Sequence, residues 1–435
     1  MRHPGIGRVA ALFVSLAVVA AACSSDDSDD TGDSAAATAA TETEAPPDTT
    51  APLETEAPTE TEAPLETEAP PEALDVRTIV ELLASDEMNG RDNQTPGSAL
   101  ARDLLVSELA AIAQPAYPDS PDGYLQTYDV GTNIIGVIPG GELADEYVVI
   151  GAHYDHHGND CRGVGPDDDI CNGAGDNAAG VGLVMDVARS IVAEGAPRRS
   201  VIVAFWDGEE DGLIGATAYL ADPLVPLDQT VAYLNWDIQG VNPMPSLKNM
   251  TVLVGAETGG PALAEAAALA TEASTLDTVM LSLLFGQGRS DHAVFAGSGV
   301  PVVFFTDGTS GCYHTVNDDV DVLDFSKLDQ QILTATALTT DIIATDDVPV
   351  FDADASTSTY ADASAMLRIA EAAESDFDLF DDETRATIEQ FLVDLEAIVE
   401  AGPDAFDETA NAIMLGGSVQ LVASIADLPC DAYTS

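Results

Sequence analysis

The sequence of 435 residues predicts an α/β protein with a central, mostly parallel mixed sheet, helices on both faces of that sheet and a helical C-terminal extension. Three observations support this prediction. Apolar segments of strand length alternate with amphipathic segments between residues 74 and 344, as in parallel sheets that are covered on both faces. Polar residues directly follow several apolar segments, where open α/β sheets bind their ligands. Beyond residue 358 only helical periodicity recurs.

The elements are expected in a simple order. Two amphipathic helices, at 76–88 and 98–113, open the ordered part. Strands are expected at 133–139, 146–155, 200–207, 230–237, 249–255 and 300–307, and further helices at 177–194, 213–220, 261–271 and 325–344. An acidic, Thr/Ser-rich link at 346–358 leads to helices at 364–374, 382–402 and 418–428. We therefore expect a sheet domain over 73–345 and a helical extension over 346–435.

The N-terminal segment has the character of an export signal. Residues 1–22 contain Arg2 and Arg8, then a short apolar run and small residues, as a secretory signal peptide requires. Cys23 follows Ala20-Ala21-Ala22 and resembles a bacterial lipoprotein attachment site, although the usual leucine three residues earlier is missing. We expect an exported protein, extracellular or at the cell surface, anchored to the membrane through lipidated Cys23 alone; plain secretion is the alternative.

Residues 23–72 are expected to be an acidic, Pro-rich, disordered tether. The ETEAP motif recurs there, and the near absence of large apolar residues leaves nothing to offset the entropy of ordering. The whole chain has a formal net charge of -62, which excludes nucleic acid and anionic lipid surfaces as favourable partners because both would be repelled. The simplest interpretation of this charge is that it keeps the protein soluble. A more specific alternative is that it attracts cationic substrates.

The cysteines indicate disulfides. After Cys23, an even set of four remains, and an exported protein favours their oxidation. Cys161 and Cys171 flank one polar loop and are expected to pair with each other, which leaves Cys312 for Cys430 by elimination. Free thiols remain the alternative.

Carboxylates and histidines follow the expected strands. The apolar run that ends in Trp206 leads into DGEED, where four carboxylates within five residues repel one another. Bound cations would remove that repulsion, and His, Asp and Glu ligands without thiolate suit zinc in a hydrolytic site. Similar residues occur at other predicted strand ends or next to a helix start: His153, Asp155, Asp176, Asp237, Tyr313 and His314.

Six motifs in order resemble one family. HYD, GAGDNAAGVG, DGEEDGLIGA, LNWDIQG, GRSDHAVF and CYHTVNDD are similar to segments of the secreted di-zinc aminopeptidases, relatives of the glutamate carboxypeptidases, the glutaminyl cyclases and the transferrin receptor ectodomain. Each motif alone is weak, but their common order is specific. The resemblance covers about 74–344 and implies a zinc-exopeptidase fold, phosphorylase/hydrolase-like, with 73–345 as the catalytic domain.

The resemblance also implies a role for each matching residue. His153 and Asp237 would hold one zinc ion, Glu210 and His314 the other, and Asp176 would bridge both. Glu209 would be the general base that accepts the proton of a zinc-bound water, which would leave a metal-bridging hydroxide as the nucleophile. Asp155 would orient His153, and Tyr313 would lie near the developing oxyanion. The implied substrates are peptides with a free N-terminus, and the implied cofactor is two zinc ions per chain.

Each residue also has an ordinary interpretation. DGEEDG alone is usually a solvated turn, Asp176 a helix cap, Asp237 a turn residue and His153 a satisfied histidine. A single metal constellation explains all of them together. His156 and His157 match no family role and are interpreted as loop residues, and Ser290-Asp291-His292 as structural support beside the site.

Four functions compete at this point. A di-zinc aminopeptidase is the simplest. A glutaminyl cyclase-like acyltransferase would use similar ligand types. A carboxypeptidase for acidic residues would need a basic clamp, for which Arg162 and Arg289 are the few basic residues near the motifs. A non-catalytic, receptor-like binding module is disfavoured because all five expected ligands and the base are present.

Overall fold

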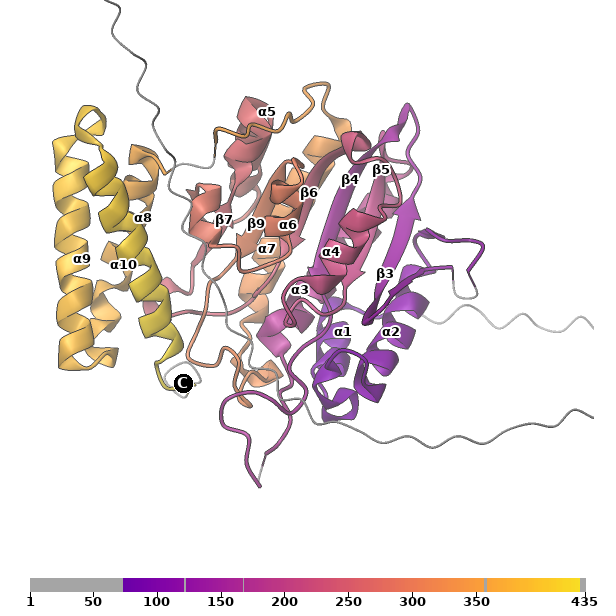
Figure 1. Cartoon of the computed structure of the whole chain (residues 1–435), viewed down its shortest axis with the longest axis horizontal. Helices are drawn as coiled ribbons and strands as arrows, with labels where there is room; N and C mark the ends of the chain where they lie inside the picture. Colours follow the sequence, from indigo (N-terminus) through magenta and orange to yellow (C-terminus); the bar gives the residue numbers. More distant parts are fainter. Residues whose placement is uncertain (1–72, 121–122, 167, 356–357, 431–435) are drawn as a thin grey trace, which may run out of the picture. The chain divides into compact units, whose positions relative to one another are not determined.

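The computed structural model describes residues 73–120, 123–166, 168–355 and 358–430. The expected signal peptide, Cys23 and the acidic tether lie outside these ranges. Within them the chain forms the predicted α/β architecture, with the helical extension after it (Figure 1).

The described residues form a nine-stranded mixed sheet. Its order is β1-β3-β5-β4-β6-β9-β7-β8, and β2 pairs with β3 outside this path. The strands are β1 Gln114–Pro115, β2 Leu125–Tyr128, β3 Gly131–Ile138, β4 Leu143–His153, β5 Arg199–Trp206, β6 Thr230–Trp236, β7 Met250–Val254, β8 Asp277–Leu281 and β9 Val302–Thr306. The centre, β5-β4-β6-β9, is parallel, while β3 and β7 join it antiparallel.

Helices cover both faces of this sheet, and its strands are apolar. Every residue of β5 and of β6 is buried, as the continuous β-branched and aromatic runs predict. One core packs α1 Val76–Leu83, α2 Pro96–Leu109, α3 Ala179–Glu194, α5 Gly260–Ala270 and α7 Phe325–Ala344 against the sheet. The other core packs α4 Ile214–Ala221 and α6 His292–Gly297 against the opposite face. In Figure 1, α4 and α6 accordingly lie in front of the strands.

Four elements were not expected from the sequence. β1 and β2 are short and pair only with β3 near one edge of the sheet. β8 has one buried residue, Val279, so its apolar pattern is weak. α6 has only six residues and follows the SDH motif. Short elements of low apolar periodicity leave no clear signal, which explains these omissions.

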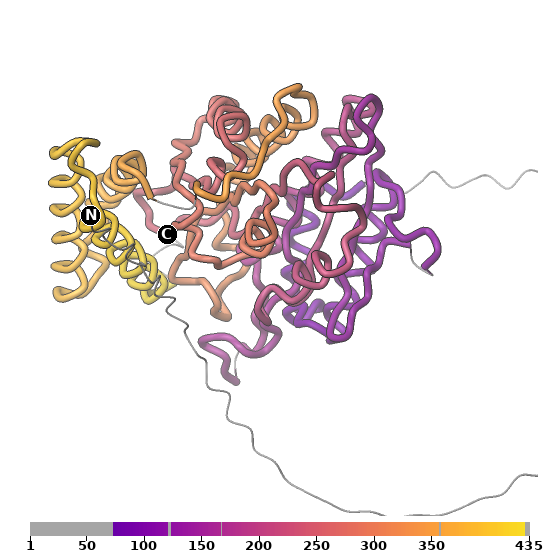
Figure 2. The backbone as a smooth tube through the Cα atoms, turned by 45° about the horizontal axis from the view of Figure 1, so that its top comes forward, coloured from indigo at the N-terminus to yellow at the C-terminus, as the bar shows by residue number. Residues whose placement is uncertain are grey.

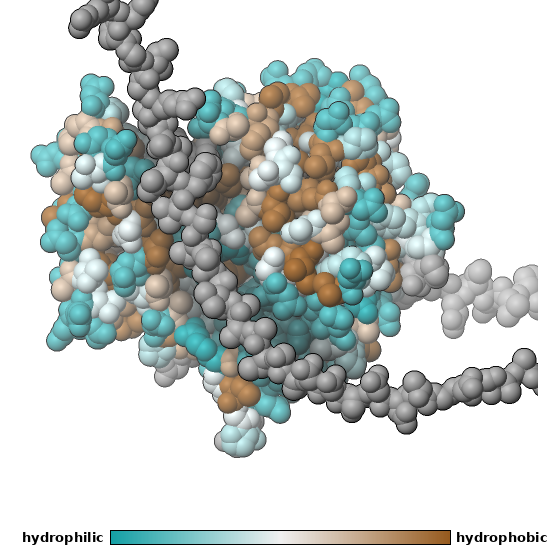
Figure 3. Space-filling view, in the orientation of Figure 1, coloured by the Kyte–Doolittle hydropathy of each residue, from teal (hydrophilic) through white to brown (hydrophobic). Residues whose placement is uncertain are grey.

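The C-terminal extension consists of three helices: α8 Tyr360–Ala373, α9 Asp382–Ala401 and α10 Glu408–Ala426. In Figures 1 and 2 they lie together beside the part of the sheet that contains β7. They share a core with Met250 and Val279 of the sheet. Val393 of α9 and Val419 of α10 are 54% and 53% exposed. Apolar residues at the surface of the molecule are brown in Figure 3.

The start of α10 corrects the prediction. We expected a helix from residue 418, but α10 begins at Glu408 and runs through Gly416-Gly417. A Cβ at position 417 would lie 2.0 Å from an atom of the Phe391 ring, so the glycine permits close packing of α10 on α9. Within the described ranges α10 is also the one helix long and apolar enough to cross a membrane, a property that it shares with core helices of soluble proteins.

Hydrogen bonds, an ion pair and a disulfide join the extension to the sheet domain. Asp362 of α8 is 2% exposed and accepts hydrogen bonds from the backbone N–H and the hydroxyl of Ser282 at 2.7 and 2.8 Å. Arg162 donates to the carbonyl oxygen of Ala426 at 2.9 Å. Cys312 forms a disulfide with Cys430, and Cys161 forms one with Cys171, so both predicted pairings are confirmed.

Replacing Asp362 by alanine is expected to destabilise the protein strongly. The change removes the acceptor of Ser282 and also that of Thr359, whose N–H and hydroxyl donate to the same carboxylate. Ser282 is buried, and each buried donor left without a partner costs about 1–3 kcal/mol, so we expect a loss of roughly 3 kcal/mol in urea unfolding. The control is Asp378→Ala, whose 92% exposed carboxylate pairs with Arg385 and should contribute less than about 1 kcal/mol. Equal losses in both variants would contradict this account.

Candidate active site

The DGEED segment follows β5 directly and is held in place by Asp155. The Asp155 carboxylate accepts the backbone N–H of Glu209 at 3.1 Å and that of Glu210 at 3.2 Å. Asp155 also lies beside His153, with its Oδ1 3.5 Å and its carbonyl oxygen 3.2 Å from His153 Nδ1. Asp155 therefore positions both the imidazole at the end of β4 and the acidic turn after β5.

A buried carboxylate lies between two histidines from distant parts of the chain. Asp176 Oδ1 is 3.1 Å from His153 Nε2, and Asp176 Oδ2 is 3.0 Å from His314 Nε2. Asp237, at the end of β6, places its Oδ1 3.3 Å from the same His153 nitrogen. The two oxygens of Asp176 thus face two separate groups of ligand atoms.

The second group centres on Glu210. Its Oε2 is 3.2 Å from His314 Nε2 and 3.1 Å from His157 Nε2, while its Oε1 is 2.7 Å from His156 Nδ1. The backbone of His156 and His157 is a loop, as expected, but their side chains join this cluster, which was not predicted. The signal was present, because both histidines directly follow the HYD motif.

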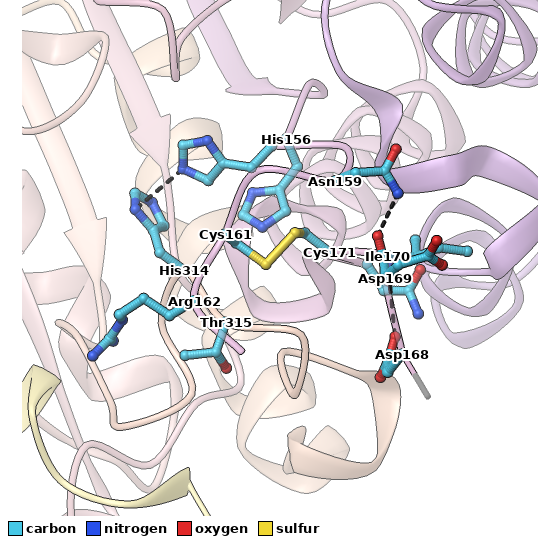
Figure 4. The surroundings of a disulfide bond; sticks show 12 residues. His156, Asn159, Cys161, Arg162, Asp168, Asp169, Ile170, Cys171, His314 and Thr315 are labelled. Atoms are coloured by element: carbon cyan, nitrogen blue, oxygen red, sulfur yellow. Dashed lines mark hydrogen bonds between the residues drawn. A yellow bond between two sulfur atoms is a disulfide. The ribbon is translucent and has the colours of Figure 1, made fainter. Parts of the chain in front are cut away.

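The close approach of His156 explains why position 173 is a glycine. Gly173 has a φ of 59°, and a Cβ there would lie 2.5 Å from the His156 ring. Any larger residue would displace the imidazole from Glu210. The Cys161–Cys171 disulfide closes the loop between these two positions and lies beside His156 and His314 in Figure 4.

The adjacent residues Glu209 and Glu210 have opposite electrostatic environments. Burial raises the pKa of Glu209 well above its usual value, and the charges of Asp237 and Asp291 add to that effect. Burial also acts on Glu210, but contacts with His156, His157 and His314 outweigh it and hold its pKa well below the usual value. Neighbouring carboxyl groups whose pKa values are driven apart are typical of sites where one group exchanges protons and the other stays ionised.

The carboxylates create a strong preference for positive charge. Burial alone would lower the pKa of His314, but its contacts with Asp176 and Glu210 raise it to about 10. Asp237 and Glu209 likewise raise the pKa of His153 well above its usual value against the effect of burial.

Tyr313 and Asp291 complete the surroundings. The Tyr313 ring stacks on His314 with a centroid separation of 3.7 Å, and burial raises the pKa of its hydroxyl, which keeps it protonated. Both carboxylate oxygens of Asp291 are buried without a hydrogen-bond partner in the described structure. Ser290 accepts a hydrogen bond from Asn235 at 2.7 Å, which ties this segment to β6.

Two buried residues support the loops that carry the site. Arg91 is fully buried and donates to the carbonyl oxygens of Tyr154, Asn172 and Gly173 at 2.9, 2.6 and 2.9 Å. Asp318 accepts the backbone N–H of Gly175 and of Asp176 at 2.9 and 3.0 Å. Together they fix the segments on either side of the disulfide loop.

The residues brought together fit a zinc site. His153, Asp176 and Asp237 offer ligand atoms that lie within 4.8 Å of one another, as do His157, Glu210 and His314, and also His156, Asp176 and Glu210. Nitrogen and oxygen donors without thiolate are a donor set that zinc accepts. The side chains at these positions also favour positive charge. All eight residues expected at the site therefore gather at one end of the sheet: His153, Asp155, Asp176, Glu209, Glu210, Asp237, Tyr313 and His314.

The sequence of this region matches a known family. Residues 133–339 match the profile of peptidase family M28. This segment is a peptidase M28 domain. It extends from β3 into α7 and contains every residue of the cluster.

Curated relatives of the M28 domain carry peptidase names. The probable glutamate carboxypeptidase LAMP1 of Arabidopsis thaliana is 32% identical over 269 residues, which cover 57% of this chain and 36% of the relative. Aminopeptidase NAALADL1 of Mus musculus is 34% identical over 113 residues, which cover 25% of this chain and 13% of the relative. The chain thus spans only a minor part of each of these two relatives.

Two solved structures align with part of this chain at low identity. LapA aminopeptidase of Legionella pneumophila aligns with a TM-score of 0.49 and 18% identity, over 62% of this chain and 71% of that one. Glutaminyl cyclase of Porphyromonas gingivalis aligns with a TM-score of 0.49 and 19% identity, over 61% of this chain and 96% of that one.

Proposed function

We propose that this protein is an exported di-zinc aminopeptidase, which removes N-terminal residues from peptides. One observation carries the proposal: the two oxygens of Asp176 face His153 and His314 at 3.1 and 3.0 Å, as a carboxylate shared by two metal ions would. The M28 domain and the peptidase names of its relatives support the same reaction class.

Zinc ligands are assigned from the two groups of atoms. His153 and Asp237 would hold one ion, Glu210 and His314 the other, and Asp176 both. His157 offers a further nitrogen to the second ion, because its Nε2 lies 3.1 Å from the same Glu210 oxygen that faces His314. His156 contacts the other Glu210 oxygen and would orient the carboxylate. Bound zinc supplies Lewis acidity for the scissile carbonyl and an acidified water.

Glu209 is assigned the proton transfers. Its carboxylate would accept a proton from the attacking water as the water oxygen bonds to the peptide carbon. It would then return that proton to the departing nitrogen as the carbon–nitrogen bond breaks. The position of Glu209 beside Asp176 and Asp237 on the wall of one cavity suits this role.

We assign Tyr313 the role of hydrogen-bond donor to the oxygen of the scissile carbonyl group. Its hydroxyl stays protonated and can donate a hydrogen bond as negative charge develops on that oxygen. Tyr313 lines the same cavity as Glu209.

One observation favours a carboxypeptidase as second candidate. Arg289 lines the cavity, with its guanidinium carbon 5.6 Å from the centroid of the Tyr313 ring, and could bind a substrate carboxylate.

Substrates with a free or an acetylated N-terminus distinguish the candidate functions. Purified protein is expected to release amino acids from unblocked dipeptide amides but not from N-acetylated ones. A chelator should abolish release, and added zinc should restore it. Cleavage of N-acetylated dipeptides that have a free C-terminus would instead establish a carboxypeptidase. Ring closure of N-terminal glutamine without cleavage would establish a cyclase, and no reaction with zinc bound would leave a binding role.

Glu209→Gln is expected to lower kcat by about 10²–10⁴-fold, the usual contribution of a general acid–base. The zinc content measured by elemental analysis should not change, because the assigned role of Glu209 is proton transfer. Glu210→Gln is the matched control at the next position and should lose both zinc and activity. A Glu209→Gln enzyme with full activity would refute the assignment of the base.

His156→Asn is expected to weaken binding of one of the two zinc ions by about 10–100-fold, as the loss of a group that orients a ligand does. The measurement is competition against a chelator of known affinity. The control is His292→Asn, which replaces another buried imidazole that has no hydrogen bond in the described structure. Unchanged affinity for both ions in His156→Asn would show that the contact with Glu210 has no role in metal binding.

A further inference from the structure

A second cavity continues from the proposed active site. The first cavity, of about 80 Å³, is lined by Asp176, Glu209, Asp237 and Tyr313 and reaches Val422 of α10. The second, of about 150 Å³, lies between the sheet and the C-terminal helices. The two share a boundary, which consists of Phe285, Gln287, Phe304, Thr306, Thr309 and Val422 among others.

The second cavity is apolar, and the extension builds one of its walls. Leu421, Val422 and Ile425 of α10 line it, opposite Val252 and Val254 of β7. Its one ionisable lining residue is Asp307, whose Oδ1 lies 2.9 Å from Nζ of buried Lys327. That carboxylate is already paired, so the cavity offers no free charge to bind an acidic or basic side chain.

The C-terminal half of α10 is fastened to the segment that carries Tyr313 and His314. The Thr309 hydroxyl donates to the Val422 carbonyl oxygen at 3.3 Å. Arg162 donates to the carbonyl oxygens of both Tyr313 and Ala426, at 2.7 and 2.9 Å. The Cys312–Cys430 disulfide joins the end of the extension to the residue before Tyr313. The wall formed by α10 is therefore fixed relative to the site.

We propose that α10 completes a specificity pocket, so that the enzyme selects peptides whose N-terminal residue has a large apolar side chain such as leucine or phenylalanine. This inference rests on the proposed aminopeptidase function. The volume of the second cavity suits such a side chain, because an apolar cavity of about 150 Å³ accommodates a benzene ring. The helix thereby gives the C-terminal extension a role in substrate choice as well as in packing.

The test compares two valines on one helix. Val422 lines both cavities, whereas Val419 is 53% exposed on α10 and lines neither of them. The wild-type enzyme is expected to show a kcat/KM for phenylalanine and leucine amides at least about tenfold above that for alanine amide, since apolar pockets discriminate by such factors. Val422→Trp should reduce this ratio at least tenfold, and Val419→Trp should leave it unchanged.

Binding of free amino acids, measured by calorimetry, separates this inference from the proposed function. Wild-type protein and Val419→Trp should bind phenylalanine more tightly than alanine, and Val422→Trp should lose this preference. Binding of phenylalanine without cleavage of any amide would refute the aminopeptidase and leave the pocket intact. Cleavage with the same phenylalanine-to-alanine ratio in wild type and Val422→Trp would refute the pocket.

A milder variant covers the case in which tryptophan at position 422 prevents folding. Val422→Ala enlarges the cavity and is expected to shift the preference from leucine toward tryptophan by several-fold. An unchanged preference in the folded Val422→Ala protein would overturn the proposal.

Discussion

The repulsion among buried carboxylates is the constraint on which the site depends. Asp176, Glu209 and Asp237 are at most 8% exposed, and Glu210 adds a fourth carboxyl group beside them. Two unit charges 4 Å apart interact by about 4 kcal/mol at an effective dielectric constant of 20. The histidines offset part of this energy, and cations at the same positions would offset more. The site therefore has a built-in affinity for positive charge, and the surrounding fold must hold it together.

That support comes from buried side chains that form hydrogen bonds with the backbone of the site. Asp155 holds the backbone of Glu209 and Glu210, Asp318 holds that of Asp176, and Arg91 holds the loops around the Cys161–Cys171 disulfide. Each bond fixes a backbone group, so the ligand side chains start from rigid positions. Such preorganisation keeps the acidic cluster in place even where its own electrostatics would push it apart.

The sequence predicts the features that follow from long apolar patterns and from motif order. β4, β5 and β6 each contain a long apolar run, and the polar residues at their ends identified site residues that the structure brings together. The roles of His156 and His157 could not be derived, because contact with Glu210 depends on how the disulfide loop folds back over the site. The start of α10 was missed because Gly416-Gly417 usually ends a helix, and only packing against Phe391 shows why the glycines are tolerated.

The position of α10 separates the two tasks that we propose for the chain near one site. The residues that we assign to zinc come from the ends of sheet strands and from the loops that follow them, where a displacement would alter the proposed chemistry. The apolar wall comes from a helix outside the M28 segment, which residues 133–339 define. Changes at Val422 or Ile425 can thus alter the cavity without replacing a residue that we assign to zinc. Cys430 and Arg162 hold α10 beside Tyr313, so such substitutions are not expected to move the helix itself.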